Sequence, residues 1–539
     1  MSTAVDNTYT NDTLFKLISS AALEQKSTNA MILPSNTTST DFSQVTYGQF
    51  LQDAVSVAHL LQSNGFKQGD VVSIVLPNGY PILACFAGTT FSRCIAAPLN
   101  SSYKEDEFNF YLQDMNAKLV IIQDGLTEAK AAATQLGLNV WTLKDNFDYA
   151  SNQYHFELFD QKDNKLDLSS KGTELADPPQ PEDVAIFLHT SGTTSKPKGV
   201  PLTHKNISTS LVNIAKTFHL SKTDRSMVVM PLFHVHGLIG VSLSTLISGG
   251  SLITPPKFSA QCFWAHVKQH KATWYSAVPT IHAILISLEK SMEDSPNKAF
   301  LRFIRSCSSS LSPTLFESLE KCYGCPVVES YGMTESSHQM TSNRLPEDGK
   351  RKVSSVGKGA FVEVGIANEE GNLLAVGQVG EVCTRGNNVM KGYNNNPTAN
   401  IENFTKQGWF LTGDIGYLDD EGYLFLKGRK KEIINRGGEK ISPLEIDNSL
   451  LECEHIAEAV CFGVPDAKYG EEIWAAVVPK TSKPDLTEQE VMEFLQKKIV
   501  SFKIPKKIFV TDSFPKTTTG KIQRRFISEH FLKIYSLRK

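Results

Sequence analysis

A short segment rich in hydroxyl and glycine residues is the first place in the sequence where chemistry is expected. It runs from His189 to Gly199 and reads His-Thr-Ser-Gly-Thr-Thr-Ser-Lys-Pro-Lys-Gly. Small residues of this kind let backbone N–H groups turn toward phosphate oxygens, and lysines add positive charge. The segment lacks the GxxxxGK[ST] pattern, because no lysine in it follows a helix-opening glycine. We therefore expect an anion-binding loop, with a flexible linker as the alternative.

Acidic and aromatic residues in two later motifs have the chemistry expected of a nucleotide site. The motifs are Tyr331-Gly-Met-Thr-Glu335 and Trp409-Phe-Leu-Thr-Gly-Asp414. Glu335 offers a hard oxygen ligand for Mg²⁺. Asp414 can accept hydrogen bonds from two ribose hydroxyls, and Tyr331 presents a flat face to a base. Taken singly, Glu335 could be a surface residue and Tyr331 a core aromatic at the end of a strand.

A basic segment closes the sequence and contains one lysine in an unusual setting. Residues 497–539 hold twelve Lys or Arg against two acidic residues, although the whole chain is net acidic. This shift indicates a second, differently charged unit, with a solvated helix face as the alternative. Lys521 lies between Gly520 and Ile522 in a Thr-rich turn, and a compact charge on a long stem suits contact with anions. The segment lacks interleaved aromatic residues of the RNA-binding type.

The elements that must position these residues follow an alternating pattern. Strand-like segments bounded by turn residues alternate with segments of helical periodicity, which indicates βαβ units and a largely parallel sheet. Helices are predicted at Leu14–Glu24 and Phe50–Asn64. Strands are predicted at Asp70–Leu76, Cys94–Leu99, Val184–His189, Ser226–Met230, Thr273–Ala277, Phe303–Ser306 and Pro326–Glu329.

The stretch between residues 357 and 428 differs in character from what precedes it. It is dense in Gly and Asn and holds short alternating segments at Val362–Ile366, Gly380–Thr384 and Tyr423–Lys427. Such a pattern predicts a small antiparallel or barrel-like subdomain.

Length and composition limit the class of protein. The chain has 539 residues, more than the ~250–300 that one hydrophobic core supports, so two or three domains are expected. Hydrophobic residues make up 41% and charged residues 21%, which excludes a disordered or fibrous protein. The 54 Lys and Arg against 57 Asp and Glu exclude a surface built to neutralise long runs of phosphate.

Cysteine usage and apolar runs indicate an intracellular protein. Nine cysteines are ordinary for a reducing compartment, and an odd number argues against a full disulfide framework. The N-terminus shows no secretory signal, and the longest apolar runs, such as Val241–Ile247, are too short to cross a membrane. We expect a soluble protein without a transmembrane segment, and the sequence does not indicate its oligomeric state.

Seven motifs, in order along the chain, resemble those of the adenylate-forming superfamily. This superfamily comprises acyl-CoA ligases, luciferases and carrier-loading adenylation domains. The resemblance extends over about residues 45–530. The motifs are Thr190–Gly199, Met230–Gly237, Tyr331–Glu335, Trp409–Asp414, Gly428–Glu432, Arg436–Lys440 and Pro515–Lys521.

The resemblance implies a fold, a reaction and its cofactors. The fold would be α/β, with a large N-terminal core domain of βα-layered sheets at residues 1–428 and a barrel-like subdomain within it at about 357–428. A smaller α/β C-terminal lid would follow at residues 429–539, with its hinge at 429–431. The reaction would use ATP and Mg²⁺ to make an acyl-adenylate and coenzyme A to take up the acyl group.

The resemblance also implies roles for single residues. Lys521, Thr334, Glu335 and His234 would be catalytic, Glu335 would hold the metal, and Lys431 would be the hinge residue. Ser195 stands where many relatives have Gly, a mild departure. Contacts to ATP or coenzyme A would come from Thr190, Ser191, Gly192, Thr193, Thr194, Lys198, Ser309, Ser310, Glu329, Ser330, Tyr331, Thr334, Asp414, Arg429, Gly438 and Lys521.

His234, Ser308 and His338 fall, by resemblance, in the acid pocket. Two imidazoles and a hydroxyl suit a second carboxylate better than a hydrocarbon tail, because each buried polar group left unpaired costs ~1–3 kcal/mol. The stretches that hold these residues also look like those of plant and fungal oxalate–CoA ligases. We therefore expect an acid–CoA ligase with oxalate as the favoured acid. A medium-chain fatty-acid or 4-coumarate-type ligase is the alternative, and a non-catalytic nucleic-acid or membrane-surface binding protein is the hypothesis from another class.

Three further signals carry less information. Cys322 and Cys325 have CxxC spacing but no second pair. His234 and His236 alternate without a third metal ligand fixed nearby in the sequence. The chain ends in Leu-Arg-Lys, where relatives of this subgroup often carry a peroxisomal Ser-Lys-Leu, so both cytoplasm and peroxisome stay open as locations.

Overall fold

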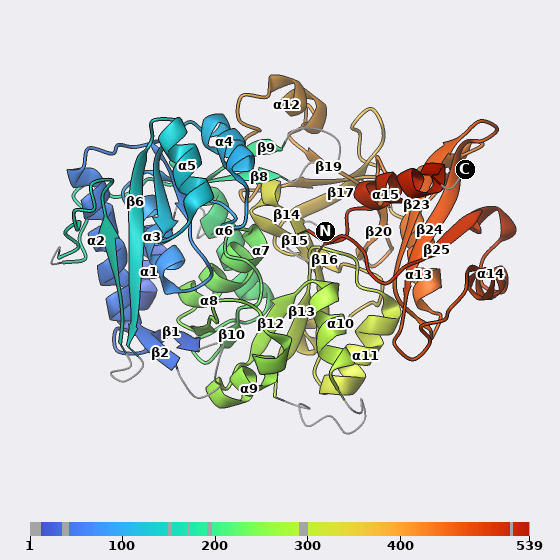
Figure 1. Cartoon of the computed structure of the whole chain (residues 1–539), viewed down its shortest axis with the longest axis horizontal. Helices are drawn as coiled ribbons and strands as arrows, with labels where there is room; N and C mark the ends of the chain where they lie inside the picture. Colours follow the sequence, from blue (N-terminus) through green and yellow to red (C-terminus); the bar gives the residue numbers. More distant parts are fainter. Residues whose placement is uncertain are drawn as a thin grey trace.

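The computed structural model describes residues 12–34, 42–148, 153–169, 172–190, 197–289, 300–517 and 521–537. Two large sheets with helices between and outside them form the N-terminal part (Figure 1). A four-stranded sheet and a further five-stranded sheet follow toward the C-terminus. The mixed α/β architecture predicted from the alternating pattern is confirmed.

The first large sheet has seven strands in the order β7-β6-β5-β3-β4-β8-β9. Its central pairs are parallel, and the edge pairs β6–β7 and β8–β9 are antiparallel. The strands are β3 (Val71–Val75), β4 (Ile95–Pro98), β5 (Ala117–Gln123), β6 (Asn139–Asp148), β7 (Gln153–Phe159), β8 (Val184–Thr190) and β9 (Lys198–Thr203).

The second large sheet has nine strands in the order β16-β15-β14-β13-β12-β10-β11-β1-β2. The strands from β14 to β1 run parallel, with antiparallel pairs at both edges. The strands are β1 (Asn29–Pro34), β2 (Phe42–Thr46), β10 (Arg225–Met227), β11 (Ser251–Ile253), β12 (Trp274–Ala277), β13 (Phe303–Ser306), β14 (Val327–Met333), β15 (His338–Ser342) and β16 (Lys358–Gly359).

The helices cover both sheets on both faces, which gives five layers. Successive strand residues point to opposite faces, so Val72 packs with the helices between the sheets and Val71 with α4 and α5. Likewise Trp274 faces the inner helices and Tyr275 faces α9, α10 and α11. The helices are α1 (Leu14–Glu24), α2 (Tyr47–Ser63), α3 (Tyr80–Phe91), α4 (Glu105–Asp114), α5 (Thr127–Gln135), α6 (His204–Thr217), α7 (Val235–Gly237), α8 (Ser244–Ile247), α9 (Ala260–His270), α10 (Pro279–Ser287) and α11 (Pro313–Tyr323).

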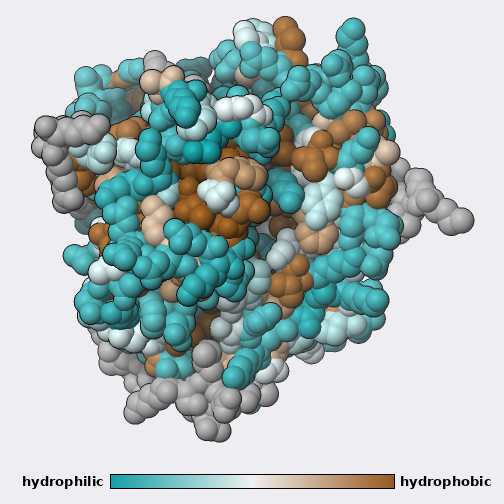
Figure 2. Space-filling view, turned by 90° about the vertical axis from the view of Figure 1, so that its right-hand side faces the viewer, coloured by the Kyte–Doolittle hydropathy of each residue, from teal (hydrophilic) through white to brown (hydrophobic). Residues whose placement is uncertain are grey.

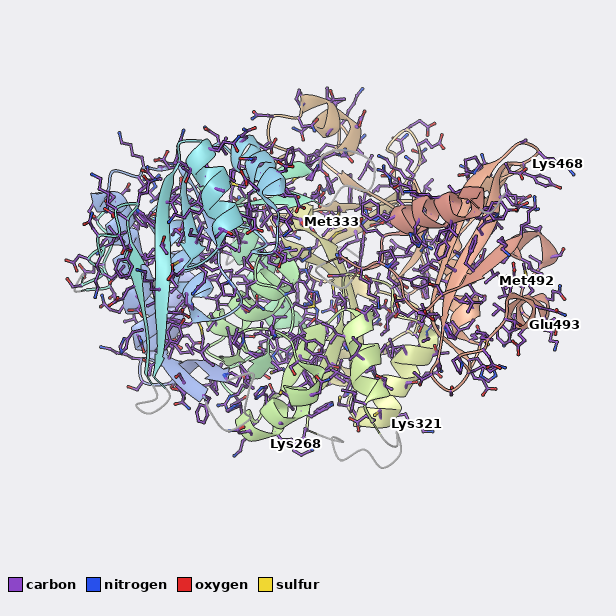
Figure 3. All side chains as sticks on the ribbon, in the orientation of Figure 1. Lys268, Lys321, Met333, Lys468, Met492 and Glu493 are labelled. Carbon is purple, nitrogen blue, oxygen red and sulfur yellow. The ribbon has the colours of Figure 1, made fainter. Side chains whose placement is uncertain are left out.

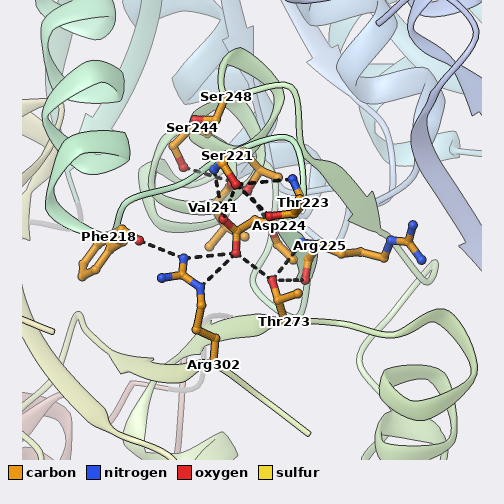
Figure 4. Close-up of polar contacts among 12 residues, drawn as sticks. Phe218, Ser221, Thr223, Asp224, Arg225, Val241, Ser244, Ser248, Thr273 and Arg302 are labelled. Carbon is orange, nitrogen blue, oxygen red and sulfur yellow. Dashed lines mark hydrogen bonds and ion pairs between the residues drawn. The ribbon is translucent and has the colours of Figure 1, made fainter. Parts of the chain in front are cut away.

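One buried carboxylate fixes three neighbouring strands of the nine-stranded sheet at their amino ends (Figure 4). Asp224, Thr273 and Arg302 each stand immediately before a strand, β10, β12 and β13. The Asp224 carboxylate accepts from the Thr273 hydroxyl at 2.9 Å and from Arg302 Nε at 3.1 Å. Because the strands are parallel and aligned at this end, their carboxyl ends also lie at one edge of the sheet.

The Gly- and Asn-rich stretch forms the predicted antiparallel subdomain. Its sheet runs in the order β17-β18-β19-β20, and the hydrogen-bonded path ends at β17 and at β20. A short helix, α12 (Pro397–Asn403), interrupts it. The strands are β17 (Glu363–Ala367), β18 (Gly380–Arg385), β19 (Phe410–Leu418) and β20 (Leu424–Arg429).

The C-terminal unit is a five-stranded sheet flanked by three helices. Two separate apolar clusters, one on each face of its sheet, are built from residues beyond 433 only. Figure 2 views this side of the molecule, where apolar patches interrupt a mostly hydrophilic surface. Val500, Phe502 and Phe526 are exposed apolar side chains of the C-terminal unit. Its elements are β21 (Ile434–Arg436), β22 (Glu439–Ile441), α13 (Pro443–Leu451), β23 (Ile456–Asp466), β24 (Gly470–Pro479), α14 (Glu488–Gln496), β25 (Lys507–Val510) and α15 (Arg524–Leu537).

None of the helices in the described part of the chain combines the length and the apolar character that a bilayer span requires.

Candidate active site

The carboxyl ends of the parallel strands in the nine-stranded sheet bring distant motifs together. Ser308 follows β13, and Thr334 and Glu335 follow β14 in a short 3-10 helix, Thr334–Ser336. Figure 3 shows Met333, the last residue of β14, near the centre of the molecule, whereas Lys468, Met492 and Glu493 lie at the outer edge of the C-terminal unit. Ligands of open α/β sheets bind at this end of the strands.

Three histidines and two serines form a polar cluster at this edge. The His236 and His338 rings are stacked, with centroids 5.3 Å apart and an interplanar angle of 21°. The two ring nitrogens of His236 contact hydroxyl oxygens, Nε2 at 2.7 Å from Ser276 and Nδ1 at 3.0 Å from Ser308. His234 Nδ1 accepts the His236 backbone N–H at 3.3 Å, so the neutral His234 ring carries its proton on Nε2. That N–H is a donor for a ligand.

Two residues of the cluster have left-handed backbone conformations. The φ angle is +74° at Ser308 and +93° at His338. Residues other than Gly, Asn and Asp rarely adopt backbone angles in this region. The buried His338 Nε2 also has no hydrogen-bond partner in the described part of the chain. Strained conformations and unsatisfied buried atoms persist where function requires them, and both occur here.

A glycine in a π-helix makes room for the His338 ring. The π-helix covers Leu238–Leu243, and a Cβ atom on Gly240 would lie 2.3 Å from His338 Nε2 and 3.1 Å from Arg305 Nη1. Single-turn π-helices are frequent at functional sites. The same numbers place the Arg305 guanidinium close to the His338 imidazole.

Burial and nearby positive charges keep these imidazoles neutral. Burial is the largest cause that lowers the pKa of His236 and His338 well below the usual value, and the charge of Arg305 is the next. Burial lowers the pKa of His234 to about 3, and the charge of Lys521 adds to the effect. The imidazoles therefore act at neutral pH as uncharged hydrogen-bonding groups beside fixed cations.

Lys521 reaches this cluster from the C-terminal unit. Its charge acts on all three histidines and lies near the Cys307 thiol and Arg429. Burial lowers the pKa of the Lys521 ammonium. Its backbone N–H donates to the Thr517 hydroxyl at 3.1 Å. The predicted catalytic lysine and the predicted acid pocket thus lie together.

The predicted ribose and base residues form one connected group. The Tyr331 hydroxyl donates to the buried Asp414 carboxylate at 2.5 Å, and Arg429 Nε lies 2.9 Å from its other oxygen. Asp414 on β19 and Arg429 on β20 are register partners. The Tyr331 ring packs in an apolar cluster with Met340 and Val382, so its facing a base stays a prediction.

Glu335 is a buried carboxyl group close to two cations. Its Oε1 accepts from the Tyr393 hydroxyl at 2.8 Å. Burial raises the pKa of Glu335, while the charges of Arg429 and Lys198 lower it. Lys198 Nζ also lies 4.5 Å above the Tyr393 ring. A carboxylate beside cations at a strand end fits a shared site for a metal ion and phosphate oxygens.

The predicted phosphate loop connects the hairpin strands β8 and β9. Thr190 and Lys198 are register partners at the end of this hairpin that the loop connects, and α6 begins at His204, capped by Thr203. The strand β9 between loop and helix was not predicted. The predicted contact residues Ser191, Gly192, Thr193 and Thr194, like Ser195, lie outside the described residues.

The other predicted contact residues take varied positions. Ser309 and Ser310 are exposed at the end of β13, and Thr334 is partly buried. The buried Glu329 accepts the Leu311 N–H at 3.0 Å, and burial raises its pKa to about 8. The Ser330 hydroxyl faces the interior and binds Arg305 and Ser342. Gly438 has a φ of +97° in an exposed turn with open space around its Cα.

Four residues of the site were not predicted, namely His236, Ser276, Arg305 and Tyr393. His236 was noticed only as a possible metal ligand, yet both its ring nitrogens contact serine hydroxyls. Arg305 had no predicted role. An arginine in the middle of the apolar strand Phe303–Ser306 is the signal that could have identified it, because charged residues are rarely buried without a reason.

Comparison with known proteins agrees with this geometry. The sequence matches the family model described as AMP-binding enzyme over residues 20–394 and the AMP-binding enzyme C-terminal domain over residues 445–521. The chain belongs to the AMP-binding enzyme family. Within this family it is an AMP-forming acyl-CoA ligase, and ATP and coenzyme A are the substrates that such a ligase uses.

Several relatives are similar over most of their length. An oxalate–CoA ligase of Arabidopsis thaliana is 46% identical over 483 residues, which cover 89% of this chain and 91% of the relative. An oxalate–CoA ligase of Saccharomyces cerevisiae is 45% identical, with 94% and 95% covered. A sulfoacetate–CoA ligase of Cupriavidus necator is 33% identical, with 90% and 92% covered.

Solved structures share the fold. ATP-bound MatB from Rhodopseudomonas palustris has a TM-score of 0.83 at 26% identity, with 97% of this chain and 99% of that chain covered. The o-succinylbenzoate CoA synthetase of Bacillus subtilis in complex with its acyl-adenylate intermediate has a TM-score of 0.78 at 26% identity, with 96% and 98% covered.

Proposed function

We propose that this ligase activates oxalate and transfers it to coenzyme A. The observation that supports this acid is the composition of the polar cluster at the carboxyl ends of the strands. It combines His234, His236, His338 and the Ser308 hydroxyl with the positive charges of Arg305 and Lys521. No carboxylate forms an ion pair with either cation in the described ranges.

Such a cluster favours an acid with two anionic groups. A hydrocarbon tail would leave His338 Nε2 and the Nε2–H of His234 without a partner, at a cost of ~1–3 kcal/mol for each group. A second carboxylate would instead accept from them and would satisfy the charge of Arg305. Two of the relatives carry names of small acids with two anionic groups, oxalate and sulfoacetate. The medium-chain fatty-acid and 4-coumarate alternatives are less compatible with this lining.

The reaction would proceed in two steps. In the first step a carboxylate oxygen of the acid attacks the α-phosphorus of ATP, an O–P bond forms, and pyrophosphate leaves. Lys521 would stand where the two anions meet, and its ammonium would reduce their repulsion. In the second step the thiol sulfur of coenzyme A attacks the acyl carbon, loses its proton, and AMP leaves.

The nucleotide would lie between the phosphate loop and the Asp414 group. Asp414 would accept from the ribose hydroxyls and Arg429 would support it. Thr334 would donate to the α-phosphate. Glu335 fits Mg²⁺ as a hard oxygen ligand beside Lys198, and the ion would neutralise charge on the phosphates.

We further propose that the C-terminal unit is a lid that rotates about residues 429–431. The backbone ladder between β19 and β20 extends to the Lys430 N–H, which donates to Gly413 O at 2.8 Å. Lys431 is the first residue beyond this ladder. Rotation there would withdraw Lys521 after the first step and bring Gly438 to the site, where its missing side chain would leave space for the pantetheine arm.

A substrate panel tests the proposed acid. Pyrophosphate release with ATP, Mg²⁺ and coenzyme A is measured for oxalate, octanoate and 4-coumarate. We expect kcat/KM for oxalate to exceed the other two by at least a hundredfold. Higher activity with octanoate or 4-coumarate would establish the corresponding alternative. If none of the three acids supports pyrophosphate release and the protein binds nucleic acid or vesicles, the non-catalytic hypothesis is favoured.

A further inference from the structure

Arg305 is a completely buried guanidinium in the middle of β13. Its relative exposure is 0%, and it is among the largest fully buried side chains of the described chain. Among the described residues its hydrogen bonds go to neutral acceptors only: Ser330 Oγ at 3.1 Å, Gly240 O at 3.1 Å and Gln339 Oε1 at 2.9 Å. Buried charges are normally paired, because burying an unpaired charge is costly. Arg305 therefore needs another explanation.

Nearby groups do not neutralise this charge. The buried carboxyl on the adjacent strand is Glu329, which accepts the Leu311 N–H and whose pKa burial raises to about 8. Burial lowers the pKa of the Arg305 guanidinium, the Cys307 thiol opposes this effect, and no carboxylate of the described residues acts on it. The Phe218 ring lies 5.3 Å from the guanidinium carbon, and this contact adds stabilisation but no negative charge.

The unpaired charge lies directly behind the acid pocket. A Cβ atom at Gly240 would lie 2.3 Å from His338 Nε2 and 3.1 Å from Arg305 Nη1, so the imidazole and the guanidinium border the same space left by the missing side chain. The charge of Arg305 is the largest electrostatic effect on both His236 and His338. The His338 ring stacks on His236, and His236 Nδ1 contacts the Ser308 hydroxyl at 3.0 Å.

We propose that Arg305 is a positioning residue that determines acid specificity: its uncompensated charge, acting through His338 and His236, selects acids that carry a second anionic group. This inference rests on the proposed acid site. A second carboxylate held by the histidines would supply the negative charge that Arg305 lacks, and an acid with one carboxylate would not. Coulomb interactions are strong at a buried site, where water does not screen them.

The first test keeps Arg305 and compensates its positive charge with a neighbouring carboxylate. Gln339→Glu puts a carboxylate at the position of the amide oxygen that Arg305 already contacts, so the hydrogen bond is kept and an ion pair is added. We expect the ratio of kcat/KM for oxalate to that for glyoxylate, an acid of similar size with one carboxylate, to fall at least tenfold. The KM for ATP should stay within about twofold and Tm should not decrease.

A matched variant separates charge from packing. Gln339→Met removes both hydrogen bonds of the amide, to Arg305 and to Thr217, without adding charge. It should lower Tm and leave the oxalate-to-glyoxylate ratio within about twofold. A second pair tests Arg305 itself, because Arg305→Lys keeps the charge and should retain the preference, whereas Arg305→Met should lose it.

The outcomes distinguish this inference from the proposed function. An unchanged ratio in Gln339→Glu, or an equal fall in Gln339→Met, would overturn the role of Arg305 while wild-type turnover of oxalate still supports the ligase proposed above. A wild-type enzyme that does not prefer oxalate to glyoxylate would overturn both.

Discussion

Tyr331 and Asp414 are joined by a 2.5 Å hydrogen bond that ties the end of β14 to β19. The donor lies in the nine-stranded sheet and the acceptor in the four-stranded sheet, so the bond connects two parts of the N-terminal domain. Arg429 pairs with the other carboxylate oxygen at 2.9 Å. The carboxylate proposed to bind ribose is therefore held on both sides by the protein itself.

Tyr331→Phe should loosen this carboxylate without changing its charge. Loss of one buried hydrogen bond to a charged group costs about 1.5–3 kcal/mol, so we expect a lower Tm and a KM for ATP raised several-fold. The KM for the acid should change little. Tyr417→Phe on β19, the strand of Asp414, is the control, because that ring stacks on Phe425. Equal effects of the two variants would contradict a role for the Tyr331 hydroxyl.

Lys521→Ala should abolish adenylation and spare the second half-reaction. Lys521 lies beside the acid pocket in this arrangement of the lid, and its charge is required where two anions meet. Pyrophosphate release should fall by at least a thousandfold, whereas thioester formation from prepared acyl-AMP should stay within about threefold. Lys516→Ala removes a lid lysine that pairs with Glu458 at 2.8 Å and serves as control. Equal loss of both half-reactions would count against two lid positions.

His338→Ala should raise the KM for oxalate far more than that for ATP. The side chain stacks on His236 and has an unused Nε2 in the described structure. Because φ is +93° at this position, His338→Asn, which tolerates left-handed backbone, separates loss of the imidazole from backbone effects. Both variants should show the same selective rise, and His219→Ala, at an exposed site, should show none. If both KM values stay unchanged, the pocket assignment is wrong.

Glu335→Gln should weaken the use of Mg²⁺. The amide oxygen can still accept from the Tyr393 hydroxyl, so Tm should be nearly unchanged, while a hard anionic ligand is lost. We expect a higher Mg²⁺ concentration for half-maximal pyrophosphate release and a kcat lowered by about a hundredfold. The exposed Glu347→Gln is the control. If Glu335→Gln needs the same Mg²⁺ concentration as the wild type for half-maximal pyrophosphate release, Glu335 is not a ligand of the metal.

Buried histidines make the fold sensitive to acid. Burial lowers the pKa of His282 to about 3 and of His204 to about 4, against about 6.5 in the unfolded chain. Below pH 6.5 the unfolded state binds protons that the folded state does not, so the free energy of unfolding decreases as pH falls. Glu329, with a pKa of about 8, has the opposite effect as pH rises above its unfolded value, but one carboxyl opposes several imidazoles.

Thermal unfolding checks this pH dependence. Tm should fall between pH 7 and pH 5, and each such histidine contributes up to about 1.4 kcal/mol per pH unit. His282→Asn can retain the contact that Nδ1 makes with the Tyr275 hydroxyl and should reduce the slope. A flat Tm over this range, or the same slope in the variant, would show that these histidines are not buried in the neutral form.

Local patterns predicted one helix and one strand with the bounds that the structure has. The helix at Leu14–Glu24 was predicted at both ends, and Thr13 caps it. The strand at Phe303–Ser306 was also predicted at both ends, although it contains Arg305 and lies between β12 and β14. The strands β9 and β19 were not predicted, since their extent depends on antiparallel pairing, of β9 with β8 and of β19 with β18 and β20.

The residues of the candidate site that were predicted are those that belong to a recognisable sequence motif. Lys521, His234, Ser308 and His338 were each named from motifs, and the structure places them together. His236 and Arg305 were not named, because their importance depends on contacts between strand ends far apart in sequence. Contacts between side chains that are distant in sequence depend on tertiary packing, and a local sequence pattern does not contain this information.

The position of Arg429 at the end of β20 has a mechanical consequence. The same residue that pairs with Asp414 is the last of its strand, and the carbonyl of Arg429 accepts the N–H groups of Glu432 and Ile433 in the turn that follows. If the C-terminal unit rotates as proposed, torsion of the chain beyond this point would pull on the arginine that pairs with the Asp414 carboxylate. Rotation of this unit and loosening of the nucleoside would then be coupled, so that AMP would leave with the motion that prepares the enzyme for its next turnover.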